Sequence, residues 1–257
     1  MRNVLAIAER ELRSYFASPI AYAVIGLFAL VFGWMFYAFL RYFIGASMRM
    51  GPGGMGQGPI NINDMLLRPL ILQISVVVLF VLPMVTMRTY SEEKRSGTIE
   101  LLLTSPLTDF QIIMGKFLGA MSLYVVMLGV TLIHIAILVV YGGRPEWKPI
   151  ATVYLGLLLL GGCFISVGLF ISSLTKNQIV AFVATFATFL MLWVITWIGT
   201  FFGPTADRLT QYLSIIGQFD DFGKGVLDTT HLIYYISFIT FGLFLTAKSV
   251  DSERWRG

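Results

Sequence analysis

Long apolar stretches without Asp, Glu, Lys or Arg dominate the chain. A helix that crosses a bilayer needs about 20 such residues, because the hydrocarbon core is about 30 Å thick. The apolar runs are continuous rather than alternating with polar positions, which favours helices over a β-barrel. The six charge-free stretches that are long enough are residues 14–40, 69–87, 117–143, 149–175, 177–206 and 229–247.

These stretches predict an all-α fold, a polytopic membrane protein with a single transmembrane domain over residues 1–257. Lys176 alone separates the fourth stretch from the fifth. Lys176-Asn177 therefore makes a very tight turn, and these two helices must form an antiparallel hairpin. The predicted transmembrane helices are residues 20–40, 69–87, 117–141, 150–174, 178–201 and 229–247.

The composition excludes other classes of protein. Apolar residues make up 57% of the chain and charged residues 12%, with a mean hydropathy of +0.80, whereas about 25% of a soluble domain is charged. Disorder requires low hydrophobicity and is excluded as well. The single cysteine, Cys163, rules out an internal disulfide and any site with several cysteine ligands. The net charge of +4 is spread along the chain, so no nucleic-acid partner is expected.

The distribution of basic residues predicts the orientation in the membrane. If the N-terminus is cytoplasmic, the cytoplasmic segments carry 11 Lys or Arg and the outer segments carry 7. Basic residues are enriched in the cytoplasmic loops of membrane proteins. We therefore expect both termini in the cytoplasm.

An amphipathic helix is predicted at residues 3–16, ahead of the first span. Its apolar side chains fall within one arc of about 120° at 100° per residue. We expect this helix to lie flat in the membrane interface, with Pro19 turning the chain into the bilayer. The alternative is a merely charged start to the first span. The residues on the arc are Val4, Leu5, Ala8, Leu12, Tyr15 and Phe16.

Two short helices are predicted in the cytoplasmic segment 88–108. Thr89 and Thr108 are each followed three residues later by Glu or Gln, the spacing of a capping box. Gly97 favours a left-handed helix end between them. The leucines at 101–103 cannot all face the interior, and that much apolar surface on a loop suggests a docked partner. The alternative is that the loop packs against its own bundle or against lipid headgroups.

Two connections are predicted on the outer side of the membrane. Glycine and proline residues make 41–68 a flexible loop. Apolar residues at helical spacing predict a re-entrant helix within 207–228. Three carboxylates follow without the spacing of a known cation site, so we expect a solvated rim. The apolar residues are Leu209, Tyr212, Leu213 and Ile216, and the carboxylates are Asp220, Asp221 and Asp228.

The chain lacks the chemistry of an ion-coupled transporter, an ATPase or an acid–base enzyme. One histidine, His134, lies deep in a predicted span, and we expect it to hydrogen-bond to a neighbouring helix. The Gly-Lys pairs at Gly115 and Gly223 do not fit a phosphate-binding loop. No nucleophile–base pair is evident around the two histidines. We therefore expect no enzyme activity and no cofactor in this chain, and energy from another subunit.

A sequence motif marks the segment between the second and third spans. Residues 90–106 read Y-S-E-E-K-R-S-G-T-I-E-L-L-L-T-S-P, and Gly115-Lys116 follows. This resembles the signature E-x(3–4)-G-T-x-E-x-L-L-x-x-P of the permease subunits of ABC-2 type ABC transporters, whose short helix couples to the ATPase. Residues 172–178, at the turn between the fourth and fifth spans, are a second likeness, and the order of elements over nearly the whole chain is also similar.

Within that family the chain looks closest to the gliding-motility permease branch. This branch is related to the permease that serves nitrous-oxide reductase maturation. The likeness rests on residues 219–228, before the last span, and on the tail at 252–256.

The resemblance implies an assembly and a function. Two copies of the chain would form a homodimer in a bacterial-type inner membrane, and two ATP-binding subunits carrying ATP and Mg would bind beneath them. Export is the implied direction of transport, and an auxiliary extracytoplasmic subunit is a possible further partner. The alternative is a membrane scaffold of an envelope or motility complex that an associated ATPase powers.

The resemblance also assigns the contact with the ATP-binding subunit to the segment 88–108. Charged side chains there would form ion pairs with the partner, and apolar ones would pack against it. No catalytic and no metal-binding residue is expected. The implied contact residues are Glu92, Glu93, Arg95, Gly97, Thr98, Ile99, Glu100, Leu101, Leu102 and Pro106.

Overall fold

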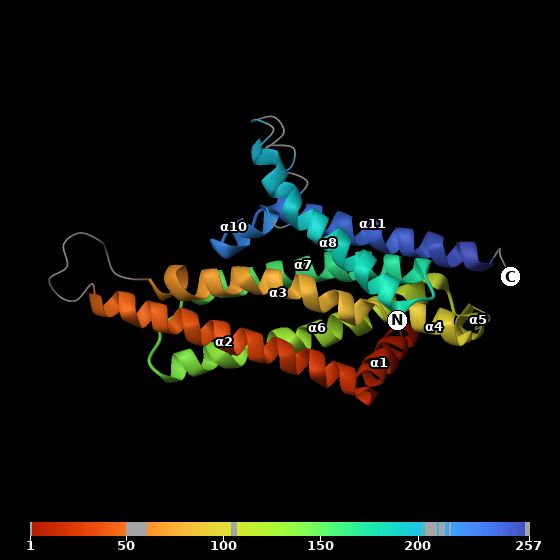
Figure 1. Ribbon diagram of the computed structural model, residues 1–257, viewed down its shortest axis with the longest axis horizontal. Coiled ribbons are helices and arrows are strands. Elements are labelled where there is room, and N and C mark those ends of the chain that lie inside the picture. The colour runs from red at the N-terminus through yellow and green to blue at the C-terminus, as the bar shows by residue number, and fades with distance from the viewer. Residues whose placement is uncertain are drawn as a thin grey trace.

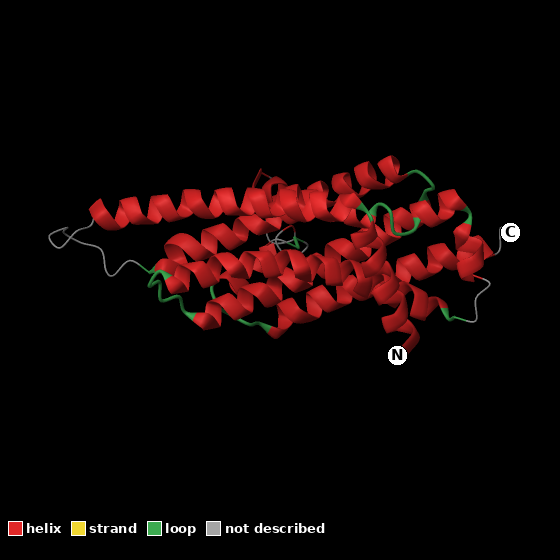
Figure 2. Ribbon diagram, turned by 90° about the horizontal axis from the view of Figure 1, so that it is seen from below, coloured by secondary structure: helices red, strands yellow, loops and turns green. Residues whose placement is uncertain are grey.

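The computed structural model describes residues 2–49, 61–103, 107–201, 203, 210, 214–215 and 217–254. Over these ranges the chain is helical with no β-strand, as Figure 2 shows. The helices are α1 (Arg2–Ala17), α2 (Pro19–Arg49), η1 (Asn63–Leu67), α3 (Arg68–Thr86), α4 (Ser91–Ser96), α5 (Thr98–Leu103), α6 (Asp109–Val140), α7 (Trp147–Leu174), α8 (Gln178–Phe201), η2 (Gly217–Phe219), α10 (Asp220–Gly223) and α11 (Thr229–Arg254).

Six helices in the described part of the chain are long and apolar enough to cross a membrane: α2, α3, α6, α7, α8 and α11. Helices α2, α3, α6 and α7 run along the long axis of the molecule, whereas α11 covers the half towards the chain ends and α8 tilts away from the others (Figure 1). Both chain ends, α4 and α5 lie at one end of the bundle, which we call the terminal end; the opposite end is the far end. The prediction of an all-α polytopic membrane protein with six spans is confirmed.

Several helices continue beyond the charge-free stretches. The helix predicted at 20–40 runs on to Arg49, the one predicted at 117–141 begins at Asp109, and the last one continues to Arg254. Charged residues mark where a helix leaves hydrocarbon, but they are good helix formers and do not end it.

Helix α7 lies at the centre of the bundle and contacts α3, α6, α8 and α11. Glycines on α7 let its neighbours approach closely, as in many membrane bundles. A Cβ atom at Gly161 would clash with the ring of Tyr124 on α6, and one at Gly168 would clash with Oγ1 of Thr86 on α3. The small residues of this span therefore form contacts within the chain.

Within the described ranges, His134 joins α6 to α2 by ring packing rather than by a hydrogen bond between helices. Its Nδ1 atom lies 3.1 Å from the carbonyl oxygen of Val130, on its own helix. Its ring contacts Phe32 and Phe36 edge-on, with centroid distances of 5.0 and 5.3 Å. The expected bond to a neighbouring helix is replaced by these aromatic contacts.

Helix α10 at the far end packs on α7. Phe222 lies against Gly156, and the Thr152 hydroxyl donates a 3.1 Å hydrogen bond to the Phe222 carbonyl. His231 contacts Asp221 at 3.0 Å, so the fold does supply the histidine–carboxylate pair that the sequence had not indicated. Hydrogen bonds from Lys224 and His231 hold the pKa of Asp221 below its usual value. The re-entrant helix predicted from Leu209, Tyr212, Leu213 and Ile216 lies outside the described residues.

Candidate functional site at the terminal end

The segment between α3 and α6 folds as helix, break and helix. Helix α4 ends at Gly97, whose φ of +75° is the left-handed conformation that the sequence predicts there. Helix α5 follows directly. The capping box at Thr108 is confirmed, because its Oγ1 accepts from Gln111 N at 3.3 Å and Gln111 Oε1 accepts from Thr108 N at 3.4 Å.

The capping box expected at Thr89 is absent, because a different residue caps α4. Ser172 of α7 accepts hydrogen bonds at its Oγ from the backbone N–H groups of Tyr90 and Ser91, both at 3.1 Å. The Thr89 hydroxyl instead lies 3.3 Å from the hydroxyl of Tyr15 on α1. Burial raises the pKa of the Tyr15 phenol well above its usual range, so this side chain remains a donor. The first turn of α4 is thus fixed by other helices.

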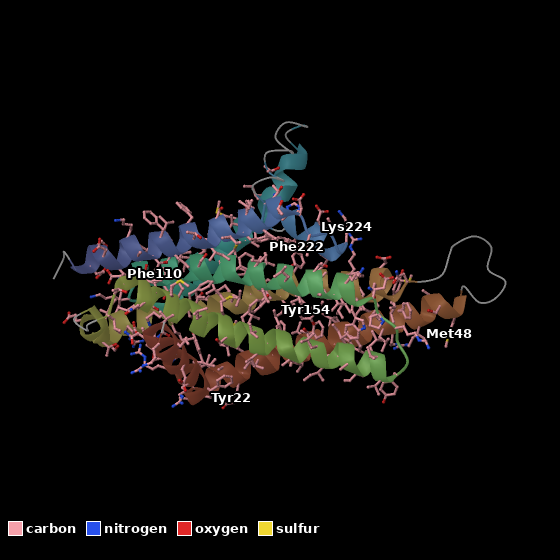
Figure 3. All side chains as sticks on the ribbon, turned by 180° about the vertical axis from the view of Figure 1, so that it is seen from behind. Tyr22, Met48, Phe110, Tyr154, Phe222 and Lys224 are labelled. Atoms are coloured by element: carbon pink, nitrogen blue, oxygen red, sulfur yellow. The ribbon has the colours of Figure 1, made fainter. Side chains whose placement is uncertain are left out.

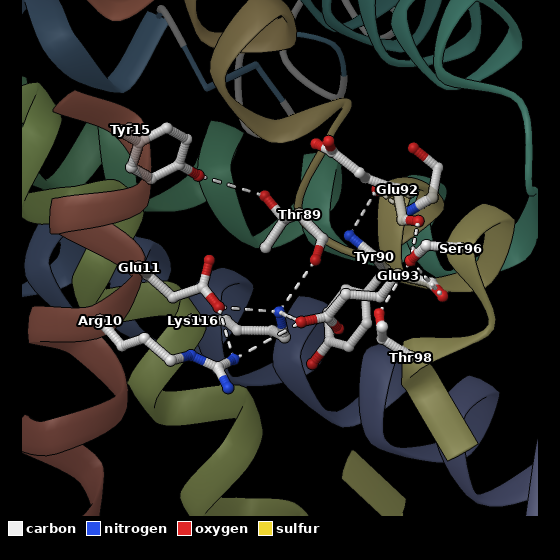
Figure 4. A network of polar contacts seen from close by, with 12 residues as sticks. Arg10, Glu11, Tyr15, Thr89, Tyr90, Glu92, Glu93, Ser96, Thr98 and Lys116 are labelled. Atoms are coloured by element: carbon white, nitrogen blue, oxygen red, sulfur yellow. Dashed lines mark hydrogen bonds and ion pairs between the residues drawn. The ribbon is translucent and has the colours of Figure 1, made fainter. Parts of the chain in front are cut away.

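Lys116, near the start of α6, is completely buried and lies at the centre of a polar cluster (Figure 4). Its Nζ atom contacts Glu11 Oε1 of α1 at 3.0 Å, Glu93 Oε1 of α4 at 2.8 Å and the Thr89 carbonyl at 2.9 Å. Arg10 lies 3.1 Å from Glu11 and 3.6 Å from Glu93. We call Arg10, Glu11, Thr89, Glu93 and Lys116 the Lys116 cluster.

The charges of the Lys116 cluster balance, with two basic and two acidic side chains. A buried ammonium group is stable only when oppositely charged and hydrogen-bonding groups surround it. The Tyr90 ring adds a further contact, with its centroid 5.0 Å from Lys116 Nζ. A single ammonium group therefore joins α1, α4 and α6.

Helix α1 reaches the Lys116 cluster because α6 has glycines where the two helices cross. A Cβ atom at Gly115 would lie 2.6 Å from Cβ of Ile7, and one at Gly119 would lie 2.6 Å from Cβ of Glu11. Only glycine permits this separation. The predicted helix at 3–16 is present and packs on α6 through Ile7 and Ala8, its buried residues.

Two further ion pairs fasten α4. Lys94 is buried and contacts Glu253 of α11 at 2.7 Å. Arg88 contacts Glu92 at 2.9 Å and also donates a hydrogen bond to Ser18, between α1 and α2, at 3.2 Å. Together with Ser172 and the Lys116 cluster, these contacts connect α4 to α1, α6, α7 and α11.

The implied contact residues fall into groups by position. Glu93 and Ile99 face the bundle, the first in the Lys116 cluster and the second in the main hydrophobic core. Arg95, Gly97, Thr98 and Glu100 are exposed, and Glu92 is half-exposed in its pair with Arg88. The backbones of Leu101 and Leu102 belong to α5, their side chains are not described, and Pro106 lies outside the described residues.

Ser172 provides a test of how firmly α4 is held. Replacing Ser172 by Ala leaves the N–H groups of Tyr90 and Ser91 buried without their acceptor, so we expect the free energy of unfolding to fall by about 1–3 kcal/mol. Ser122→Ala is the matched control, because among the described residues that hydroxyl bonds only to the Leu118 carbonyl of its own helix. Unfolding in detergent measures both, and equal stability of the two variants would contradict the capping role.

The profile of the ABC-2 family transporter protein matches residues 61–222, well over half of the chain. The chain belongs to the ABC-2 transporter family. A search of curated proteins finds no match. The matched region includes α4, α5 and Lys116, whereas Glu11 lies outside it. Members of the ABC-2 family are membrane transport components without catalytic activity of their own, and membership implies an ATP-binding ABC partner and a lipid bilayer.

Proposed function

We propose that this chain is the permease subunit of an ATP-driven exporter, and that α4 and α5 receive the movement of its ATP-binding subunit. The observation that carries the proposal is the Lys116 cluster. It joins α4, which α5 follows directly after Gly97, to α1 and α6 through one buried ammonium group.

The proposed mechanism is mechanical. Closure of the ATP-binding subunits would push α5, and the turn at Gly97 would pass the displacement to α4. Lys116 would then carry it to α6, and Glu11 would carry it to α1. Because packed helices shift between discrete arrangements rather than deforming continuously, the spans would change between inward-facing and outward-facing packings.

The implied contact residues divide in this proposal by where their side chains lie. Glu92, Arg95, Thr98 and Glu100 are exposed and would lie at the contact with the partner, and Leu101, Leu102 and Pro106 would complete its contact surface. Glu93 and Ile99, which face the bundle, hold the segment to the permease instead. The partner would therefore contact α5 more than α4.

The wider assembly is proposed from the family resemblance. Two copies of the chain form a homodimer in a bacterial inner membrane, with both termini cytoplasmic. Two ATP-binding subunits carry the ATP and Mg, and an auxiliary extracytoplasmic subunit completes the complex. The resemblance of residues 219–228 supports a place in the gliding-motility branch.

The proposal is tested by purifying the tagged chain from its native membrane and measuring ATP hydrolysis in what copurifies. We expect an ATP-binding subunit to copurify with the wild-type chain and to be absent from preparations of Leu102→Asp. In the Glu100→Lys variant, we expect the rate of ATP hydrolysis no longer to respond to the permease. Leu227→Asp is the control, since it places the same charge on an exposed leucine of the connection between α10 and α11, away from α4 and α5. A stable homodimer without ATPase, unchanged by either variant, would contradict the proposal and favour the scaffold.

A further inference from the structure

A large cavity lies between α2 and α6 towards the far end of the bundle. The two helices are in contact where His134 packs against Phe32 and Phe36. Beyond that point they separate, and α2 leaves the bundle near Met48 (Figure 3). The space between them has a volume of about 990 Å³, which is at the upper end of the range for small-molecule sites.

The walls of this cavity are apolar and its polar groups lie at one end. Phe36, Leu40 and Phe43 of α2 face Ile137 and Leu138 of α6 across it. The turn that follows α6 closes the far end and brings Arg144 to the mouth, and Asn61 lies there as well. The cavity therefore has the polarity of an amphiphile, with a long apolar part and a small polar end.

Exposed aromatic residues place the mouth of the cavity at the level of the lipid headgroups. Tyr42, Tyr141 and Trp147 are all exposed near the far ends of their helices, and such residues are enriched at membrane–water interfaces. The apolar walls then lie at the depth of acyl chains.

Arg144 supplies the charge at the mouth. Within the described ranges it makes no ion pair. The nearest acid in sequence, Glu146, is engaged elsewhere, because its backbone and side chain accept hydrogen bonds from Asn63 and Asn61 at 3.1 and 3.3 Å. An exposed guanidinium group at headgroup level fits a phosphate, which arginine binds with two parallel hydrogen bonds.

We propose that the cavity is a binding site for one phospholipid of the surrounding leaflet. Its phosphate binds Arg144, and an acyl chain lies between α2 and α6 against Leu40 and Phe43. Water is a poor occupant, because the walls offer few polar partners. A bound lipid would hold the far ends of α2 and α6 apart.

The site is tested on the purified chain in nanodiscs of phosphatidylethanolamine and phosphatidylglycerol. Native mass spectrometry counts the phospholipid retained by the chain, and a phosphatidylglycerol with a photoreactive acyl chain marks its contacts. We expect retained lipid and cross-links to residues 36–44 and 137–141. Leu40→Trp places a larger ring in the path of the proposed acyl chain and is expected to weaken both, whereas Leu30→Trp on the exposed side of the same helix should change neither.

Arg144→Gln provides the second variant, because an exposed residue is replaced without disturbing the core. We expect it to retain phospholipid about tenfold more weakly, since one charge-assisted contact is lost. Equal retention by the wild type and both variants would overturn the site. Cross-links spread evenly over all spans would also overturn the site. The same holds if phospholipid is retained only after residues 51–58 are deleted, because that segment would then be the occupant of the cavity. No nucleotide or partner is involved, so failure here leaves the proposed function unaffected.

Discussion

Replacing Lys116 by Met is expected to lower the free energy of unfolding by about 3–5 kcal/mol, because it leaves buried carboxylates without their cation. Glu11 and Glu93 both contact Lys116 Nζ, and Arg10 alone would then face them from a more exposed position. We further expect a complex with this variant to hydrolyse ATP without any response from the permease. Unfolding in detergent and ATP hydrolysis by the assembled complex measure the two effects.

Two comparisons separate the loss of a charge from the loss of the connection. Lys176→Met removes a lysine from the exposed turn between α7 and α8 and should leave the stability unchanged. Adding Glu11→Gln and Glu93→Gln to Lys116→Met removes the unpaired charges, so most of the lost stability should return. Coupling should stay absent, because the ammonium group that joins the three helices is still missing. A triple variant that regains stability and coupling together would show that the cluster only stabilises the fold.

The spans could be predicted from the sequence because the bilayer sets a simple length rule. Apolar runs of about 20 residues must cross it as helices, whatever their neighbours are. The break at Gly97 and the capping box at Thr108 could also be predicted, since both depend on residues close together in the chain. Such local interactions can be recognised from the residues of a single segment.

The Lys116 cluster could not be predicted in this way. It brings together residues 10–11, 89–93 and 116, and nothing in one segment indicates which of the others it will contact. In the sequence, Lys116 is half of a Gly-Lys pair that follows the coupling motif, and it marks the edge of an apolar stretch, but neither fact indicates a buried ion pair. The resemblance placed Glu93 on the surface towards a partner, because a motif gives the order of residues and not the side of the helix. The cap that Ser172 supplies could not be predicted either, because Ser172 lies on α7, far from α4 in the chain.

Replacing Gly115 by Leu is expected to release α1 from α6. A Cβ atom there would lie 2.5 Å from Cγ2 and 2.6 Å from Cβ of Ile7, and 3.2 Å from the Val4 carbonyl oxygen, so the backbone of α1 must move. Overpacking of this kind is destabilising by about 1–3 kcal/mol. It also draws Glu11 away from Lys116, so we expect the permease to lose its response to ATP hydrolysis.

The movement of α1 is measured in the Ala8→Cys background, by the rate at which the introduced thiol reacts with a water-soluble thiol reagent. Ala8 is buried against α6, and the native Cys163 is buried in the core, so the background is low. We expect Gly115→Leu to raise the rate roughly tenfold or more. Gly129→Leu on the same helix is the matched control, because in the described part of the chain no atom of another helix lies within 4 Å of the position its Cβ would take. If both variants label alike, the close packing of α1 on α6 does not hold the cluster together. If Gly115→Leu labels faster but ATP hydrolysis still responds to the permease, α1 is a passive anchor and the movement passes from α4 to α6 alone.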